Sequence, residues 1–167
     1  MVRDFNAKLI MNNRPSWDKY FMDIAKLTGR RSTCLRRSVG CVLVKSKDII
    51  STGYNGAPAK TEHCIDAGCK RENSESGKDL HNCVALHAEQ NAILQALSKG
   101  LDITGSTLYV TTYPCTNCCK LIVQTKIAKI IVLNSYSKNE IGKKEITCIL
   151  NIQTHPPQHR KDGQTSG

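Results

Sequence analysis

The sequence is poor in aromatic residues and has no long apolar run. Aromatic residues make up 5% of the 167 residues, which is thin for a surface that stacks the bases of single-stranded nucleic acid. The apolar runs are far shorter than a membrane span, and the first residues lack the charged-then-apolar pattern of a secretory leader. Internal repeats and low-complexity segments are also missing. We expect a soluble, cytoplasmic protein, with no membrane partner and no extended nucleic-acid platform.

Acidic residues are scarce relative to basic ones. The chain has 24 Lys and Arg against 14 Asp and Glu, a formal net charge of +10. The excess is scattered, and its only dense cluster is RRSTCLRR at residues 30–37. A solvated face is the simpler explanation of this cluster. The overall charge also favours an anionic substrate.

Cysteine, by contrast, is abundant. Nine cysteines in a secreted mini-protein would suggest disulfides, whereas in a cytosolic enzyme they suggest bound metal. Cys41 lies in the apolar run VGCVLV and is predicted to be a small buried hydrophobe. Cys148, near the end of the chain, remains unassigned.

The hydrophobic pattern predicts alternating helices and strands. A helix begins after Ser16 and ends near Gly29, and a long irregular insertion occupies residues 55–85. The other predicted elements are strands at 39–45 and 49–54 joined by a turn at 46–48, a helix at 88–98, a strand at 107–112, a helix from Pro114 to about 125, and a strand at 129–133. The last strand–helix–strand unit should be a right-handed parallel crossover. A three-layer α/β/α fold with a mixed central sheet follows.

Two short motifs carry the chemistry. His87-Ala88-Glu89 opens one predicted helix, and Pro114-Cys115-Thr116-Asn117-Cys118 opens the next. One imidazole and two thiols can hold zinc with an open fourth position, and this pair of motifs is the signature of zinc-dependent nucleobase deaminases. The alternative is a buried helix start with two packed thiols. Cys119 is expected to be a core thiol, because adjacent residues point apart on a helix.

Four segments together resemble the deoxycytidylate (dCMP) deaminase family. They are GYNGAPAK at 53–60, HAEQNAI at 87–93, LYVTTYPCTNCCKLI at 108–122 and IIVLNSY at 130–136. The resemblance covers about residues 16–136 and implies the cytidine-deaminase-like form of the α/β/α fold. It also implies hydrolytic deamination of dCMP to dUMP and ammonia, which feeds thymidylate synthesis. In that chemistry zinc activates a water for attack on C4 of cytosine, and Glu89 moves the proton to N3 and helps ammonia leave.

The resemblance also implies further site residues. Asn55 would lie near the sugar, Tyr136 near the pyrimidine, and the main chain of Thr112 and Tyr113 at the base edge. Asn55 also suits a turn, since Asn-Gly is a strong turn dipeptide, and Tyr136 could equally be a surface aromatic. Residues expected to face the 5′-phosphate are Arg36 and Arg37. The family is often hexameric and regulated by dCTP and dTTP, which implicates Gly53, Tyr54, Asn55 and Gly56 as a candidate effector site.

A second cysteine cluster occupies the insertion. Such a long, weakly apolar loop needs something to order it, and a closed four-ligand zinc site would do so. By resemblance to phage and bacterial relatives, the favoured ligands are Cys34, Cys64, Cys69 and Cys83, with His63 as a substitute. Unligated reduced cysteines are the alternative. The sequence therefore predicts one catalytic zinc and a second, structural zinc.

The end of the chain departs from the family pattern. Residues 1–153 are expected to form the deaminase domain, while residues 154–167 are polar and expected to be disordered. The last element of the sheet could be missing or shortened, which bears on the oligomer and on regulation. Lys60 stands where the family commonly has a small residue, which weakens the effector assignment.

Other functions remain open at this stage. The enzyme could act on both dCMP and dCTP, or it could deaminate a base in tRNA or single-stranded DNA by base flipping. The insertion and the Gly-Tyr-Asn-Gly segment argue against nucleic acid. A zinc-bound DNA-uptake or structural protein without turnover is a third possibility, but structural zinc would not need Glu89.

Overall fold

A five-stranded mixed sheet forms the centre of the molecule. A computed structural model describes residues 14–75, 78–134 and 151–154. The strands are β1 (Gly40–Lys45), β2 (Asp48–Tyr54), β3 (Thr107–Thr112), β4 (Lys129–Asn134) and β5 (Asn151–Thr154), in the order β2-β1-β3-β4-β5. β1 is antiparallel to β2 and β3, whereas β3, β4 and β5 are parallel. The predicted mixed sheet and parallel βαβ unit are thus confirmed.

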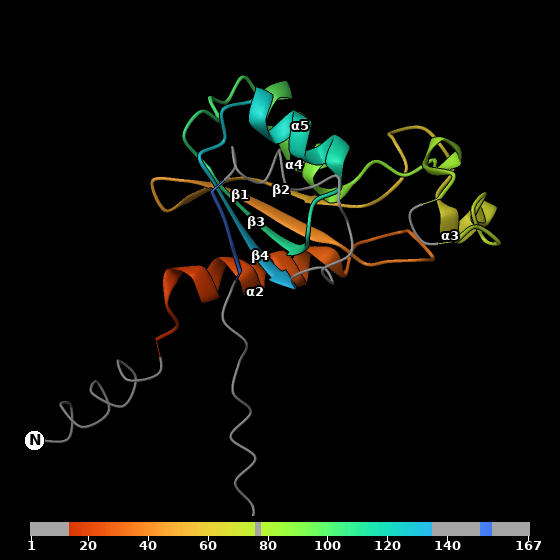
Figure 1. Ribbon diagram of the computed structural model, residues 1–167, viewed down its shortest axis with the longest axis horizontal. Coiled ribbons are helices and arrows are strands. Elements are labelled where there is room, and N and C mark those ends of the chain that lie inside the picture. The colour runs from red at the N-terminus through yellow and green to blue at the C-terminus, as the bar shows by residue number, and fades with distance from the viewer. Residues whose placement is uncertain (1–13, 76–77, 135–150, 155–167) are drawn as a thin grey trace, which may run out of the picture.

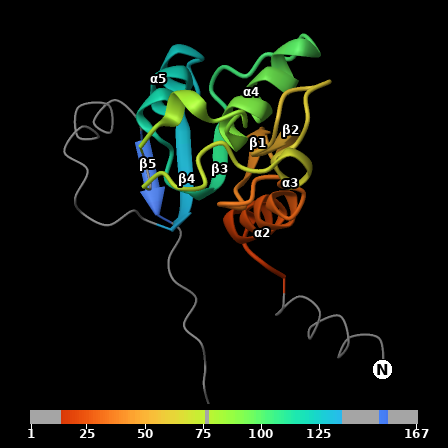
Figure 2. The same cartoon turned by 90° about the vertical axis from the view of Figure 1, so that its right-hand side faces the viewer.

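Helices cover both faces of the sheet. Helix α2 (Trp17–Gly29) lies on one face, and helices α4 (Ala88–Ser98) and α5 (Thr116–Gln124) lie on the other, as Figure 1 shows. The view turned by 90° in Figure 2 shows the same three layers from the side. Two short helical segments, α3 (Cys64–Ala67) and a 3₁₀ turn at Leu80–Asn82, interrupt the otherwise irregular insertion. The three-layer architecture is as predicted.

Each face of the sheet buries its own apolar core. On the α2 side, Phe21, Met22 and Ala25 pack against alternate residues of the strands, among them Val42 and Tyr109. The core on the α4 and α5 side is larger, with Ala92, Ile93, Ala96 and Ile122 packed on residues such as Cys41, Leu43 and Val110. Because strand side chains alternate between faces, near-continuous apolar strands are what a sheet covered on both sides requires. Cys41 is fully buried, as expected of a small core residue.

The β1–β2 hairpin has a two-residue loop. Ser46 and Lys47 both have positive φ, at 53° and 69°, and Lys45 pairs with Asp48. Two central residues of positive φ are the mark of a type I′ turn, whose twist matches that of the strands it joins. The turn is one residue shorter than the 46–48 predicted.

The end of the described chain adds a strand that the sequence left uncertain. β5 pairs in parallel with β4, from Lys129 opposite Asn151 to Val132 opposite Thr154. The sheet therefore keeps a fifth, short element. Thr154, expected to belong to a disordered tail at 154–167, is instead the last residue of β5. The rest of that tail, residues 155–167, lies outside the described residues. No helix within the described ranges is long and apolar enough to span a membrane.

Candidate metal centre and substrate pocket

Three donor side chains meet where α4 and α5 begin. His87 is the N-cap residue of α4, and Cys115 is the N-cap residue of α5. Both sulfurs, those of Cys115 and Cys118, lie 3.4 Å from Nδ1 of His87. Sequence reasoning had placed Cys115 inside the first turn of its helix, but the helix begins one residue later, at Thr116. The three predicted ligands are nevertheless brought together.

The separation of these atoms fits a tetrahedral zinc ion. Nitrogen and sulfur ligands bound at ordinary zinc distances lie roughly 3.5–3.8 Å from one another. The three ligand atoms here all lie within 4.8 Å of one another. Within the described part of the chain, this is the one group of at least three His, Cys, Asp or Glu residues that satisfies that geometry. The donor set therefore fits zinc with one coordination position left over.

Hydrogen bonds from α4 to β2 fix the position of His87 and Glu89. The Asn91 amide donates to the Tyr54 carbonyl at 2.8 Å, and the Ser51 hydroxyl donates to the Ala92 carbonyl at 2.7 Å. At the helix start, the side-chain oxygen of Gln90 accepts from the His87 N–H at 2.8 Å. The first two bonds attach the N-terminal part of α4 to β2, and the third stabilises the start of the helix.

The thiols and the imidazole influence one another strongly. The hydrogen bond from Cys118 lowers the pKa of the Cys115 thiol to about 3, with a further contribution from His87. The same hydrogen bond, together with burial, raises the pKa of the Cys118 thiol. The hydrogen bond to Cys115 raises the pKa of His87, while burial and the positive charge of Arg71 act against it. A cation in the centre of this group would allow both sulfurs to be thiolates.

Glu89 is buried next to the metal-binding group. Its side chain is 4% exposed, and burial raises the pKa of its carboxyl above the ordinary value. A carboxyl whose pKa is moved toward neutrality can both accept and donate a proton. It is not one of the three mutually close donors, and its role in proton transfer stays a prediction.

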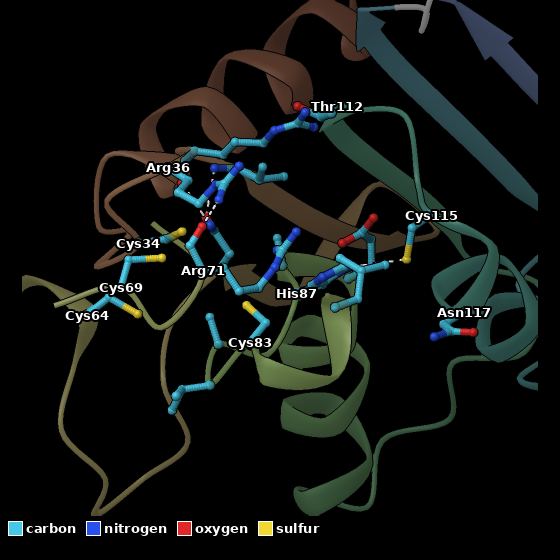
Figure 3. Close-up of a pocket in the computed structure, with 18 of the residues that line it drawn as sticks. Cys34, Arg36, Cys64, Cys69, Arg71, Cys83, His87, Thr112, Cys115 and Asn117 are labelled. Carbon is cyan, nitrogen blue, oxygen red and sulfur yellow. Dashed lines mark hydrogen bonds between the residues drawn. The ribbon is translucent and has the colours of Figure 1, made fainter. Parts of the chain in front are cut away.

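A cavity of about 690 Å³ opens over the metal-binding group. Figure 3 shows Cys115 on one side of it and Cys34, Cys64 and Cys69 on the other, with His87 and Cys83 between them. Six of the predicted site residues beyond the metal ligands line this cavity, namely Asn55, Thr112, Tyr113, Arg36, Arg37 and Glu89. Tyr136 lies outside the described residues.

Asn55 and Arg36, both predicted to bind nucleotide, also make hydrogen bonds that hold parts of the fold together. The side chain of Asn55 accepts from the Val39 N–H and donates to the Arg37 carbonyl, both at 2.8 Å. Asn55 therefore fixes the approach to β1, and its substrate role stays a prediction. The guanidinium of Arg36 donates to the carbonyls of Arg71 and Ser74. Arg36 thus holds the insertion against the cavity, and its contact with phosphate remains a prediction as well.

The candidate effector residues do not all lie at the cavity. Of Gly53, Tyr54, Asn55 and Gly56, Asn55 is the one that lines the cavity. Gly53 packs directly on α4, where a Cβ would collide with backbone atoms of Ala88 and Ala92. The close approach of α4 explains why a glycine stands at position 53, and nucleotide regulation through residues 53–56 stays a prediction.

The four cysteines of the predicted second site line the far end of the cavity. Burial raises the pKa of Cys64, and the proximity of Cys34, Cys69 and Cys83 raises it further. All four line the cavity, but among the described residues they do not form a group of three donors within 4.8 Å of one another, as the donors around His87 do. His63 instead pairs with the Thr33 hydroxyl at 3.0 Å. The number of zinc ions therefore stays a prediction.

Arg71 is one of the cavity residues that sequence reasoning missed. Arg71, in the insertion, is 9% exposed and lines the cavity. In the sequence it is one charge in an irregular, polar segment, with no motif or periodicity to distinguish it. Only the folding of the insertion over α4 brings it near His87.

The fold and this site define the class to which the protein belongs. Residues 15–134 match the family described as the cytidine and deoxycytidylate deaminase zinc-binding region. The chain is a member of that family. The match includes all three donors and Glu89.

Particular relatives refine this assignment. The chain is 46% identical over 129 residues to the deoxycytidylate deaminase of Saccharomyces cerevisiae, a match that covers 76% of this chain and 40% of the yeast protein. It is 40% identical over 124 residues to the deoxycytidylate deaminase of Mycobacterium phage D29, covering 71% of this chain and 95% of the phage protein. The chain thus spans about two fifths of the length of the yeast relative and nearly all of the phage one.

A solved structure has the same architecture. The dCMP deaminase of cyanophage S-TIM5, in complex with dCMP and dUMP, superposes with a TM-score of 0.70 at 28% identity. The superposition covers 85% of this chain and 98% of the phage protein. The predicted cytidine-deaminase-like fold is therefore confirmed.

Proposed function

We propose that this protein is a zinc-dependent deaminase that hydrolyses dCMP to dUMP and ammonia. The observation that supports this most directly is the convergence of His87, Cys115 and Cys118 beside the buried carboxyl of Glu89. A structural zinc site has no use for such a carboxyl. Similarity to named dCMP deaminases, one solved with dCMP and dUMP, supports the choice of substrate.

Each residue of the group has a distinct task. His87, Cys115 and Cys118 would hold zinc, which when bound makes water a nucleophile near neutral pH. Glu89 accepts the proton of that water on a carboxylate oxygen and donates it to N3 of the cytosine ring. Once the water oxygen is bonded to C4, Glu89 would take the remaining hydroxyl proton and deliver it to the amino group. That group leaves as ammonia when the C4–N bond breaks and the C4 carbonyl forms, so that one residue serves as base and acid. Thr112 and Tyr113 line the cavity, and their backbone would orient the base.

The insertion is proposed to bind a second, structural zinc. Cys34, Cys64, Cys69 and Cys83 share one end of the cavity, and a metal there would join the insertion to the segment before β1. This would order residues that have few apolar contacts of their own. Because His63 bonds to Thr33, we favour the four cysteines as the ligand set.

We also propose that the protein assembles into a homo-oligomer, with a hexamer as the expected form. Leu94 and Leu97 of α4 are about half exposed, as is Trp17 of α2. If these side chains belong to a contiguous apolar patch, a second copy of the chain could cover it. Light scattering of the purified protein measures the subunit number, and dCTP and dTTP can be added to test for effectors.

The test of the main proposal is ammonia release from dCMP by zinc-quantified protein. Cytidine, dCTP and a cytosine-containing oligonucleotide are assayed in parallel. Turnover of dCMP above the others supports the proposal, and comparable turnover of dCTP would make the enzyme bifunctional. Preferential turnover of the oligonucleotide would overturn it in favour of a nucleic-acid base deaminase.

A further inference from the structure

Arg71 combines burial, charge and an unsatisfied donor. Its Nε is the one buried side-chain nitrogen or oxygen atom in the described residues that lacks a hydrogen-bond partner. A buried donor without a partner is unfavourable, most of all on a charged group. A buried and incompletely hydrogen-bonded charge in a cavity wall favours a site in which an anion lies beside it.

The surroundings of Arg71 hold it in place. Its Nη2 donates to the Lys78 carbonyl, and its own carbonyl accepts from Arg36. Arg36 also donates to the Ser74 carbonyl at 2.7 Å, so that it fastens both ends of the 71–74 turn. Figure 3 shows Arg71 between Arg36 and His87. The side chain is therefore anchored over the cavity rather than extended into solvent.

The cavity around Arg71 is strongly positive. Four cationic residues line it, Arg36, Arg37, Lys70 and Arg71, against Glu89 as the one carboxylate in the lining. The positive charge of Arg71 also acts to lower the pKa of His87. A low-dielectric wall with an excess of one sign attracts an anion of the opposite sign. Arginine is well suited to phosphate because its planar fork donates two parallel hydrogen bonds.

We propose that Arg71 binds the 5′-phosphate of the pyrimidine nucleotide and so determines that the substrate is a nucleotide rather than a nucleoside. This inference rests on the proposed function and adds a residue from the insertion to its site. The phosphate would pair with the positive charge of the Arg71 guanidinium, while Arg36 acts on Arg71 as a positioning residue. The insertion then has a role in substrate choice as well as in structure.

The test compares ligands that differ in the phosphate alone. Arg71→Ala and Arg71→Lys are assayed for dCMP and deoxycytidine deamination, and for equilibrium binding of dUMP and deoxyuridine to the zinc-bound protein. We expect Arg71→Ala to lower kcat/KM for dCMP about tenfold to a hundredfold, chiefly through KM, with deoxycytidine unaffected. Arg71→Lys, which keeps the charge but loses the fork, should fall in between. Lys78→Gln is the control, since it removes an exposed charge of the same insertion and keeps the carbonyl that Arg71 uses.

Two results would overturn the inference. One is an equal proportional loss on dCMP and deoxycytidine, which would make Arg71 a purely structural residue; the other is unchanged dUMP binding in both variants. Circular dichroism and zinc content check folding, and if Arg71→Ala does not fold, Arg71→Lys decides the matter. A wild-type protein that binds dUMP far better than deoxyuridine but does not turn over dCMP would contradict the proposed function alone. The dUMP measurements would then still test Arg71.

Discussion

At the scale of single residues, the site consists of side chains whose burial and partners suit them to zinc chemistry. Glu89 is 4% exposed, and burial raises the pKa of its carboxyl. The His87 Nδ1 atom faces both sulfurs at 3.4 Å. Cys119, next to Cys118, is buried and donates to the Pro114 carbonyl at 3.7 Å, which confirms the expectation that it is a core thiol.

Replacing Glu89 by Gln should separate proton transfer from metal binding. Because Glu89 is not a ligand, we expect Glu89→Gln to retain the catalytic zinc but to lose about 100- to 10,000-fold in kcat on dCMP. Zinc is measured by elemental analysis and turnover by ammonia release. Glu62→Gln, an exposed change of the same kind in the insertion, should have no effect. A near-wild-type rate in Glu89→Gln would show that another group moves the proton.

At the scale of the elements, the position of α4 relative to β2 decides whether the site forms. Gly53 of β2 lies so close to α4 that an added Cβ would overlap the Ala88 carbonyl and lie 2.5 Å from the Ala92 nitrogen. Nearby, Asn91 and Ser51 bond across the same interface. The sequence indicated the strand and the helix separately, but it gave no sign that this glycine sets the distance between them.

Substituting alanine at Gly53 should therefore displace α4. The clash is with backbone atoms that cannot rotate away, so we expect Gly53→Ala to lose about 1–3 kcal/mol in free energy of unfolding. Because α4 carries His87, zinc affinity should fall as well. Urea titration and competition with a chelator measure the two effects. Thr52→Ala, one residue earlier and half buried, should change stability much less; equal effects of the two variants would contradict this account.

The exposed ion pair between Lys45 and Asp102 should make the stability of the fold depend on pH. Lys45 at the end of β1 contacts Asp102 at 2.7 Å, and this hydrogen bond, with that from the Thr104 N–H, lowers the pKa of Asp102 to about 2. A carboxyl whose folded pKa is depressed stabilises the fold above its unfolded pKa of about 3.9 and loses that effect as pH falls toward the folded value.

Asp102→Asn should thus have a lower melting temperature than the wild type at pH 6, and the difference should vanish between about pH 4 and pH 2. The pair is largely exposed, so the effect should be small and weaker at high salt. Differential scanning calorimetry across this range measures it. In a Lys45→Gln background the difference should shrink, and a difference that grew on acidification would show the opposite linkage.

At the scale of the whole molecule, the insertion forms one side of the cavity over the metal-binding group. It contributes Cys64, Cys69, Arg71 and Cys83 to the lining, opposite the metal-binding group of α4 and α5. The sheet beneath is complete to β5, so the unusual end of the chain still supplies a fifth strand. The insertion is thus both the least regular part of the described chain and the part that completes the cavity.

The number of zinc ions tests how the insertion is ordered. We expect two zinc ions per chain in the wild type and one in the Cys69→Ala/Cys83→Ala double variant, because two ligands cannot hold a closed structural site. Elemental analysis after extensive dialysis gives the count. Cys41→Ala, which removes a fully buried thiol elsewhere, should keep both ions. Two ions in the double variant would eliminate the second site as assigned.

The sequence by itself determined the order of the helices and strands from α2 to β4, the three candidate zinc donors and the carboxyl predicted to transfer protons. It could do so because hydrophobic periodicity is local and because the two zinc motifs are short and specific. The tertiary structure alone decided that Cys115 caps its helix, that Gly53 sets the position of α4, and that Arg36 supports Arg71 beside His87. These features depend on contacts between segments distant in sequence, or on where a helix takes its first hydrogen bond. Composition and spacing carry no record of such contacts, because many sequences with the same pattern would pack differently.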